Sequence, residues 1–363
     1  MSALLGVALG TSAEGLVGYW DGTGIVPAPA ASDLDERLNA LQPDARAAAV
    51  MQDGAGLLTV TEGVGVTEVS AGDMSVSLRR PDPKAELAAE GLTHIRDAMD
   101  LRADRLEEIL VQQGDMTSFF GLLMKLDGFG NRWIGDALGI AYDLAVPVEM
   151  LMKFHLQVPR PIDFTPRIQP IIQTPSHGSC PSGHATEAYL FATVLALLKA
   201  KAMWPQDDAC ATVLAAMVVG PKDGKAKPGQ VSGEMQTFTK DVTLLFELAA
   251  RIADNRTVAG VHFPVDSAQG ALLGLGLGLA MADPLLGEQC MFKAVIPKTD
   301  KAAWKGPFSQ AAWLKWINED LNLTVDESTA APDRSPLIRE IGRRAVRSLN
   351  PAVTALSVPK AAG

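Results

Sequence analysis

The chain has 363 residues, of which 47% are hydrophobic, and a formal net charge of −10 at pH 7. This length is sufficient for one large domain or two. The acidic balance argues against a general surface for nucleic acids or anionic membranes, and we expect neither as a partner. A cluster of basic residues in such a chain therefore indicates a local anion site.

The N-terminal part, residues 1–84, is rich in Gly, Ala, Pro and Thr and predicts an irregular segment. Within it, the stretch from Leu58 to Val69 alternates around a Glu-Gly pair, which is typical of a small hairpin. From Lys84 onwards the apolar residues follow three- and four-residue steps, so we expect an amphipathic helix that stops near Gly114.

Helical periodicity continues through the rest of the chain, interrupted by a polar loop at Gly220–Gly233. Helices are expected at Thr117–Lys125, Asn131–His155, Ser182–Met203, Asp208–Val219, Thr239–Ala259, Pro264–Met281, Gln310–Leu321 and Pro336–Leu349. The predicted fold class is mostly α, a helical bundle with a small irregular or β-containing N-terminal part. We expect a boundary that separates residues 1–84 from a helical domain over residues 85–363.

The three cysteines, Cys180, Cys210 and Cys290, are far apart and form no CxxC motif, which predicts reduced thiols without a disulfide or a zinc site. The N-terminus matches a secretory signal only weakly. The most apolar stretch, Ala268 to Met281, is shorter than the roughly 20 residues that a membrane span needs. We therefore expect a soluble, cytoplasmic protein with no membrane insertion.

The tetrapeptide Pro181-Ser182-Gly183-His184 predicts the start of a helix, because a long periodic apolar segment follows it. The free backbone N–H groups at such a start, together with the helix dipole, favour a bound anion. Ser182 adds a hydroxyl donor, and His184 is suited to act as a general acid or base. Alone, the tetrapeptide also fits an ordinary serine-capped helix with a surface histidine.

His262 lies two residues before Pro264, which fits the first turn of another helix, and Asp266 falls in that same turn. The four-residue spacing lets the carboxylate hold one imidazole nitrogen and leaves the other with a free lone pair. That nitrogen can bond to phosphorus or vanadium. The pair also fits a capping aspartate beside a buried histidine.

Three cations accompany these motifs: Lys153, Arg160 and Arg256. A guanidinium binds two oxyanion oxygens at once, and an ammonium supplies a point charge. Any one of these cations alone is more often a solvated surface group. All three in this order with both histidine motifs indicate a site for a tetrahedral or trigonal-bipyramidal oxyanion.

This spacing, from Lys153 to Asp266, resembles the signature shared by vanadium-dependent haloperoxidases and the type-2 phosphatidic acid phosphatase superfamily. The resemblance implies a pair of four-helix bundles and vanadate as the cofactor, with phosphate able to compete for or replace it. It implies His262 as the vanadium ligand, or as the phosphorylated histidine in a phosphatase. The remaining implied roles are acid–base catalysis for His184, ligand orientation for Asp266, and oxygen binding for Lys153, Arg160, Ser182, Gly183 and Arg256. Asn255 departs from the family pattern, which has a serine there.

Two features favour the bromoperoxidase-like branch of this superfamily. The interval between His184 and Arg256 is longer than is usual in the membrane phosphatases. His177 occupies a position that is typically His in bromide-oxidising haloperoxidases and Phe in chloride-oxidising ones. Without that role, His177 is an ordinary loop histidine.

The implied reaction is oxidation of bromide or iodide by hydrogen peroxide to hypohalous acid, which halogenates a small organic acceptor. Because relatives often assemble, we also expect a homo-oligomer. The alternative is a soluble acid phosphatase that hydrolyses phosphomonoesters through a phospho-His262 intermediate. A third alternative is an anion site without turnover.

Overall fold

The computed structural model describes residues 43–63, 65–124, 126, 131–217 and 233–349. The first part contains α3 (Pro43–Asp53), β1 (Thr59–Gly63), β2 (Val66–Ala71), β3 (Met74–Arg79), the π-helix η2 (Pro83–Gly91), α4 (Leu92–Ala98), the 3₁₀ turn η3 (Met99–Leu101), α5 (Arg102–Gln112), α6 (Thr117–Phe120), α7 (Arg132–Leu156), α8 (Pro161–Phe164) and η4 (Pro166–Ile168). The rest contains α9 (Gly183–Met203), α10 (Ala209–Ala216), α11 (Gly233–Val258), α12 (Pro264–Ala280), α13 (Ala282–Leu286), β4 (Glu288–Val295), η5 (Asp300–Ala302), α14 (Gln310–Glu319), β5 (Asn322–Ala330) and α15 (Pro336–Leu349).

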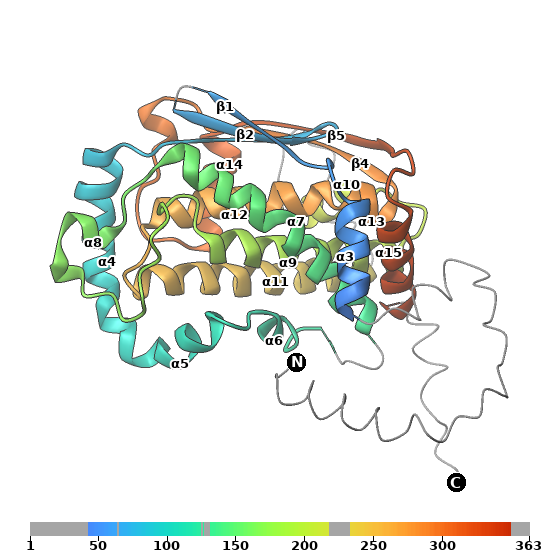
Figure 1. Ribbon diagram of the computed structural model, residues 1–363, viewed down its shortest axis with the longest axis horizontal. Helices are drawn as coiled ribbons and strands as arrows, with labels where there is room; N and C mark the ends of the chain where they lie inside the picture. The colour runs from blue at the N-terminus through green and yellow to red at the C-terminus, as the bar shows by residue number, and fades with distance from the viewer. Residues whose placement is uncertain (1–42, 64, 125, 127–130, 218–232, 350–363) are drawn as a thin grey trace, which may run out of the picture. The chain divides into compact units, whose positions relative to one another are not determined.

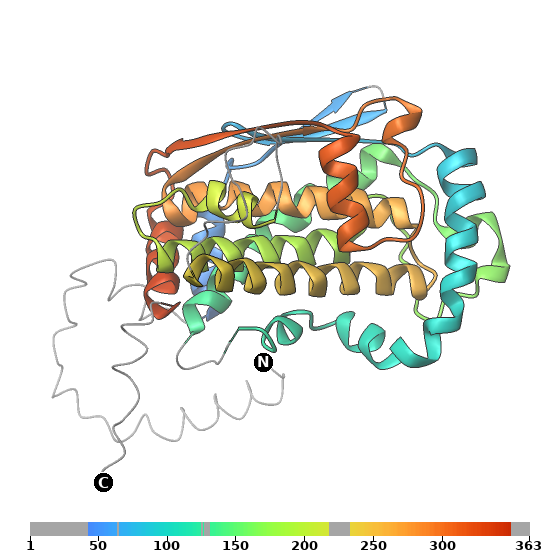
Figure 2. The ribbon, with the colours of Figure 1, turned by 180° about the vertical axis from the view of Figure 1, so that it is seen from behind.

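Helix α9 is the centre of a bundle in which α7, α11 and α12 pack around it (Figures 1 and 2). Its sequence is apolar on all sides, and most of its residues are buried. A helix without a polar face is stable only where other elements cover it completely. The mostly α fold predicted from the sequence is confirmed.

The contact between α12 and α9 depends on glycines at four-residue spacing, which share one face of the helix. Gly270, Gly274 and Gly278 all lie against α9, and a Cβ atom at Gly274 would meet the carbonyl oxygen of Thr186 at 2.2 Å. Only glycine allows the two backbones to approach this closely. The starts of both helices are joined as well, since the Ser182 amide donates to the carbonyl oxygen of Asp266 at 2.9 Å.

The segment Pro264–Leu286 is the one described helical segment long and apolar enough to cross a membrane by length and composition. In the structure 83% of its most apolar window is buried inside the protein. Its apolar character is accounted for by its place at the centre of the bundle, between α9 and the sheet.

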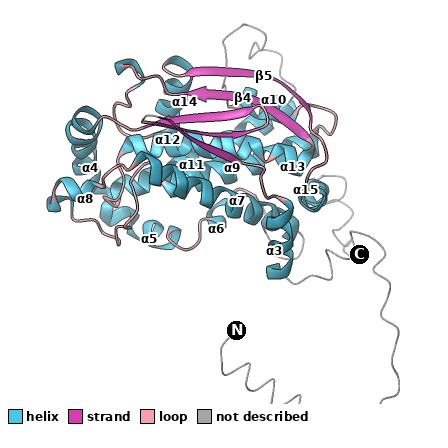
Figure 3. Ribbon diagram, turned by 45° about the horizontal axis from the view of Figure 1, so that its top comes forward, coloured by secondary structure: helices cyan, strands magenta, loops and turns pink. Residues whose placement is uncertain are grey.

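A five-stranded sheet in the order β1-β2-β3-β4-β5 packs over α12 and α7 (Figure 3). Neighbouring strands are antiparallel, except that β3 and β4 pair in parallel. The predicted hairpin is present as β1 and β2, whereas β3, β4 and β5 were not expected. Because strands from both sides of residue 84 share one sheet, residues 59–79 pack with the helical part; the predicted division into domains stays a prediction.

Most predicted helices occur close to their expected positions, with two clear differences in extent. Helix α6 ends at Phe120, five residues earlier than expected, and α11 begins at Gly233 rather than at Thr239. The predicted polar loop at Gly220–Gly233 lies almost wholly outside the described residues.

The expectation that all three cysteines are reduced thiols is wrong for two of them. Cys210 at the start of α10 and Cys290 in β4 form a disulfide, with their Cα atoms 6.0 Å apart. Cys180 is buried and free. The pairing escaped the sequence because the partners are 80 residues apart and meet only when β4 passes α10.

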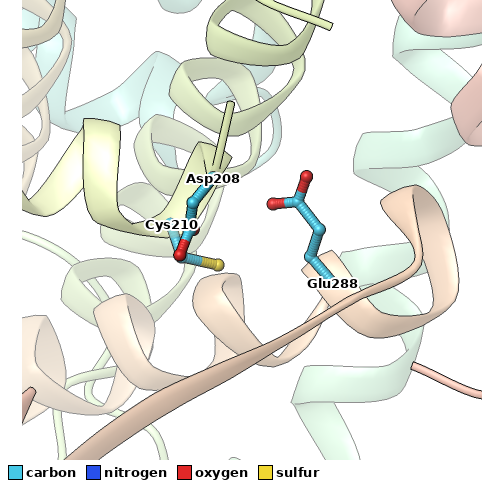
Figure 4. Close-up of side chains that lie close together, drawn as sticks. All are labelled: Asp208, Cys210 and Glu288. Atoms are coloured by element: carbon cyan, nitrogen blue, oxygen red, sulfur yellow. The ribbon is translucent and has the colours of Figure 1, made fainter. Parts of the chain in front are cut away.

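Two carboxylates lie beside Cys210, from Asp208 and Glu288 (Figure 4). Both are occupied: Asp208 caps α10 through the Ala211 amide at 2.9 Å, and Glu288 accepts from the Ala209 amide at 2.9 Å. With the sulfur of Cys210 in the disulfide, this cluster anchors the start of α10 and offers no free set of metal ligands.

Candidate active site

The predicted cationic and histidine motifs meet where several helices begin or end. Lys153 is in the last turn of α7, and Arg256 is in the last turn of α11. Arg160 precedes α8, Ser182 precedes α9, and His262 immediately precedes the residue that caps α12. We call the group formed by Lys153, Arg160, Ser182, Gly183, His184, Arg256 and His262 the cradle.

The protonation of His262 follows from its neighbours. Nη1 of Arg160 lies 3.0 Å from its Nε2 atom, and a guanidinium only donates hydrogen bonds. Nε2 is therefore an acceptor with a lone pair, and Nδ1 carries the hydrogen and donates to Oδ2 of Asp266 at 3.3 Å. Burial, followed by the charge of Arg160, holds the pKa of His262 well below its usual value. In the structure Asp266 holds one ring nitrogen, while the nitrogen that was expected to be free accepts a hydrogen bond from Arg160.

Asp266 is fully buried and accepts further hydrogen bonds besides the one from His262. Its Oδ2 atom also accepts from the Phe263 amide at 2.9 Å and from the hydroxyl of Ser179. Burial raises the pKa of Asp266 to about 6, against the opposing effect of these hydrogen bonds. Ser179 was not predicted; its position between His177 and the Pro-Ser-Gly-His turn is the only sequence signal for it.

His184 has the opposite arrangement of its ring nitrogens. Its Nε2 atom lies 3.0 Å from the backbone carbonyl oxygen of Gln112, which can only accept, so Nε2 carries the hydrogen. Nδ1 is then left as the basic nitrogen. Burial, with the nearby charge of Arg256 second, lowers the pKa of His184 to about 3. The imidazole is therefore neutral at physiological pH, and an anion bound beside it would raise its proton affinity.

Lys153 is buried beneath the Pro-Ser-Gly-His turn, where its ammonium donates to the carbonyl oxygen of Pro181. Oε1 of Glu149, one turn earlier on α7, lies 3.5 Å from the ammonium. Burial lowers the pKa of Lys153, and the charge of Glu149 opposes this shift. Glu149 also gives a reason for Gly183, since a Cβ atom there would lie 2.6 Å from Oε1 of Glu149.

Arg256 is held by groups from α5. Its Nη2 atom donates to Oε1 of Gln112 at 3.0 Å and to the carbonyl oxygen of Ile109 at 3.3 Å. Asn255, the departure from the family pattern, donates to the same Oε1 atom at 3.0 Å. Burial lowers the pKa of Arg256 to about 10, so the guanidinium stays charged at neutral pH.

Buried donors without a partner in the described structure gather at this place. They are the hydroxyl of Ser182, the Nε and Nη1 atoms of Arg256, and the Nε2 atom of Gln112. Buried polar groups in native proteins are normally hydrogen-bonded, because an unmade bond costs about 1–3 kcal/mol. These four donors lie on residues of the cradle or in contact with it, and the oxygens of an oxyanion suit them; buried atoms without a partner also occur elsewhere among the described residues, as at Arg79 and Thr174.

His177 is exposed and does not belong to the cradle itself. Its Nδ1 atom lies 3.1 Å from Nη2 of Arg160, and its carbonyl oxygen accepts from Nε of Arg160 at 3.1 Å. Burial of the ring, followed by the charge of Lys153, lowers the pKa of His177. His177 therefore acts on the cradle through its hydrogen bonds to Arg160 and through its electrostatic interaction with Lys153.

A pocket of about 380 Å³ opens beside His184, lined among others by Gln112, Leu138, Tyr142, Glu187 and Phe191. Glu187 lies one turn after His184 on α9. Burial, with the charge of Glu149 second, raises its pKa to about 8. The volume falls within the range of small-molecule sites in proteins.

Comparison with known proteins supports the same superfamily. Residues 137–283 match the family profile described as PAP2 superfamily, a range that contains every cradle residue. Over 105 residues the chain is 33% identical to a vanadium-dependent bromoperoxidase of Ascophyllum nodosum. That match covers 28% of this chain and only 16% of the relative. No solved structure matches the chain significantly.

Proposed function

We propose that the cradle binds vanadate and that the protein uses hydrogen peroxide to oxidise bromide or iodide to hypohalous acid. The observation that carries the proposal is the set of unpartnered buried donors, Ser182, Arg256 and Gln112, beside two further cations. The bromoperoxidase of Ascophyllum nodosum supports the choice of vanadate over other oxyanions.

In this proposal the charge of the cradle neutralises the oxyanion. Lys153, Arg160 and Arg256 supply three cations in a buried setting, where electrostatic interactions are stronger than in water. The hydroxyl of Ser182 and the exposed amides at the start of α9 supply neutral donors. The lone pair on Nε2 of His262 is the ligand atom, and bound vanadate supplies the Lewis acid that activates peroxide for two-electron oxidation of halide.

His184 moves the proton in this scheme. Because its Nε2–H is bound to the carbonyl oxygen of Gln112, the basic Nδ1 atom is the one that accepts a proton from hydrogen peroxide. This nitrogen is unprotonated at neutral pH, and the negative charge of the bound oxyanion raises the pKa of His184 towards the range in which it can exchange a proton. A small organic acceptor for hypohalous acid is accommodated in the adjacent pocket.

The second candidate is phosphomonoester hydrolysis, and the pocket beside His184 is the observation that favours it. An organic leaving group placed there lies next to His184, as the protonation of an alcohol requires. The lone pair on Nε2 of His262 is then the nucleophile. For this reaction the negative charge of phosphate must raise the pKa of His184, so that the imidazole can act as an acid.

One paired assay separates the two functions. The purified protein, with and without orthovanadate, is tested for bromination of a phenolic dye with peroxide and bromide, and for hydrolysis of a chromogenic phosphomonoester. We expect vanadate-dependent bromination that is lost in His262→Ala and kept in His94→Ala, a substitution at a half-buried histidine on α4. Hydrolysis inhibited by vanadate, without bromination, assigns the protein to the phosphatases.

A further inference from the structure

Gln112, the last residue of α5, contacts both the cationic and the proton-transfer sides of the cradle. Its side chain accepts from Arg256, and its backbone carbonyl oxygen accepts from Nε2 of His184 at 3.0 Å. It lies outside the range 137–283 that matches the superfamily profile, and outside the segment that carries the motifs. The side chain is only 2% exposed.

The orientation of the Gln112 amide is fixed by chemistry. Oε1 lies 3.0 Å from Nη2 of Arg256 and 3.0 Å from Nδ2 of Asn255. A guanidinium has no acceptor, so the atom that faces it must be the oxygen, and an exchange of the amide oxygen and nitrogen is excluded. The NH₂ group is consequently the part of the amide that makes no contact with Arg256.

This NH₂ group is buried and has no hydrogen-bond partner within the described part of the chain. Two residues of the cradle have buried donors in the same condition: Arg256, at two nitrogens, and Ser182, at its hydroxyl. A tetrahedral oxyanion carries several oxygens with lone pairs, which are the acceptors that such donors need.

Asn255 and its neighbours hold Gln112 in place. The Nδ2 atom of Asn255 also donates to Oε2 of Glu108 at 3.1 Å, and its Oδ1 atom accepts from Nη1 of Arg105 at 3.1 Å. These contacts fasten α5 to α11 next to Arg256. Asparagine donates two of these hydrogen bonds and accepts a third, whereas the serine of the family pattern has a single O–H donor.

We propose that Gln112 is an additional oxyanion-binding residue, whose NH₂ group donates to the bound ion while its oxygen positions Arg256. The proposal rests on the proposed function only in requiring an oxyanion in the cradle, and it holds for vanadate and for phosphate. It adds α5 to the elements that build the site.

The test measures binding of orthovanadate and inorganic phosphate by calorimetry, without reference to turnover. Gln112→Met keeps the shape but loses both contacts, and we expect affinity to fall about 10- to 100-fold, as for other groups that orient a site. Gln113→Met, at the exposed neighbouring residue, is the matched control and is expected within twofold of wild type. Equal affinity in Gln112→Met and Gln113→Met overturns the proposal.

Gln112→Glu separates the donor from the acceptor. A carboxylate still accepts from Arg256 and Asn255, but at neutral pH it has no hydrogen to donate and repels an anion. We expect weak binding at pH 8 that recovers towards wild type at acidic pH, where the carboxyl gains an O–H donor. If the dissociation constant of Gln112→Glu stays in a constant ratio to that of the wild type across pH, the donor role is contradicted.

A crystal structure of the wild-type protein with orthovanadate gives a direct reading that does not depend on any variant folding. We expect Nε2 of Gln112 within about 3.2 Å of an oxyanion oxygen. A bound ion more than about 4 Å from Nε2 overturns the proposal while it leaves the oxyanion site intact. Absence of binding of either ion to the wild-type protein overturns the proposed function instead.

Discussion

Nη1 of Arg160 lies 3.0 Å from Nε2 of His262, so the nitrogen that is proposed to bind the oxyanion already accepts a hydrogen bond. Arg160 is otherwise held by the carbonyl oxygens of Val261 and His177. When an oxyanion binds, the hydrogen bond between Arg160 and His262 is therefore replaced by contacts from each side chain to the ion. Besides these two carbonyl oxygens, the guanidinium contacts Nδ1 of His177, so it has three contacts that do not involve His262.

Gly183→Ala is predicted to weaken oxyanion binding roughly tenfold and the fold by about 1–3 kcal/mol. The new methyl group would lie 2.6 Å from Oε1 of Glu149, and the carboxylate cannot move without disturbing Lys153. Calorimetry with orthovanadate and urea denaturation measure the two effects. Gly139→Ala on α7 is the matched control, since a Cβ atom there meets nothing within 4 Å.

A rescue experiment tests the stated cause of this loss. In Gly183→Ala combined with Glu149→Asp, the shorter carboxylate makes room for the methyl group, and part of the affinity should return. If the double variant binds no better than Gly183→Ala, the clash with Glu149 is not the reason.

Glu187→Gln is predicted to reduce the decrease in the free energy of unfolding that occurs as pH rises from about 4.5 to 8. The pKa of Glu187 is raised to about 8 in the folded protein, chiefly by burial, so the folded state holds this proton more tightly than the unfolded state does. Its contribution is present below the unfolded pKa and is lost as pH rises through 8, with a slope of at most about 1.4 kcal/mol per pH unit. Urea denaturation at several pH values measures this, with Glu247→Gln at an exposed position as control. Parallel curves for Glu187→Gln and wild type would contradict the raised pKa.

His184 makes the opposite contribution on the acid side. Its pKa is lowered to about 3, so the unfolded state binds the proton first. Stability from this group is present above its unfolded pKa of 6.5 and is lost as pH falls through 3. In His184→Gln this part of the acid destabilisation should be absent, which the same denaturation series measures.

His177→Phe is predicted to change the pH dependence and the halide preference of the proposed oxidation, with a severalfold loss of oxyanion affinity. The substitution removes the Nδ1 acceptor, which lies 3.1 Å from Nη2 of Arg160. His177→Asn offers an oxygen in a similar place without a titrating group, and should retain affinity while losing the pH effect. An unchanged profile and affinity in His177→Phe would return His177 to an ordinary loop histidine.

The disulfide predicts a specific thiol count. Denaturation without reductant should expose one thiol per chain, from Cys180, and denaturation after reduction should expose three. Cys210→Ser should cost about 2–4 kcal/mol of stability under oxidising conditions, since the bond closes a long loop. Oxyanion binding should not change. Three reactive thiols without reductant would show that the pair is reduced.

The motif residues were predictable because each stands next to a helix boundary with its own sequence signal. Pro181 and Gly183 mark the start of α9, and Pro264 marks the start of α12. That these residues lie close together in the folded protein could be predicted only from the resemblance to the superfamily. The local geometry of Asp266 and His262 was predictable because only four positions separate them across the start of α12.

The residues that the sequence did not reveal act across long distances or without a periodic signal. Gln112 meets Arg256 from another helix, and no local pattern distinguishes it from the neighbouring Gln113. Glu149 could have been predicted from the sequence, since it lies four residues before Lys153 on a predicted helix. Strand β4 also carried a signal, because Cys290, Phe292 and Ala294 alternate along it, but its pairing with β3 depends on residues far away in the chain.

The glycine face of α12 has a consequence for how this protein can change during evolution. Since Gly274 allows no side chain against Thr186, mutations there cannot adjust the distance between the helices that carry His184 and His262. The pocket beside His184 is lined on another side by residues at the end of α5, in α6 and in the first half of α7. There, a Cβ atom at Gly135 or Gly139 would meet no other atom within 4 Å, so larger side chains fit. Substitutions on this side of the pocket can therefore change which molecules fit beside His184, while the two histidines keep their positions.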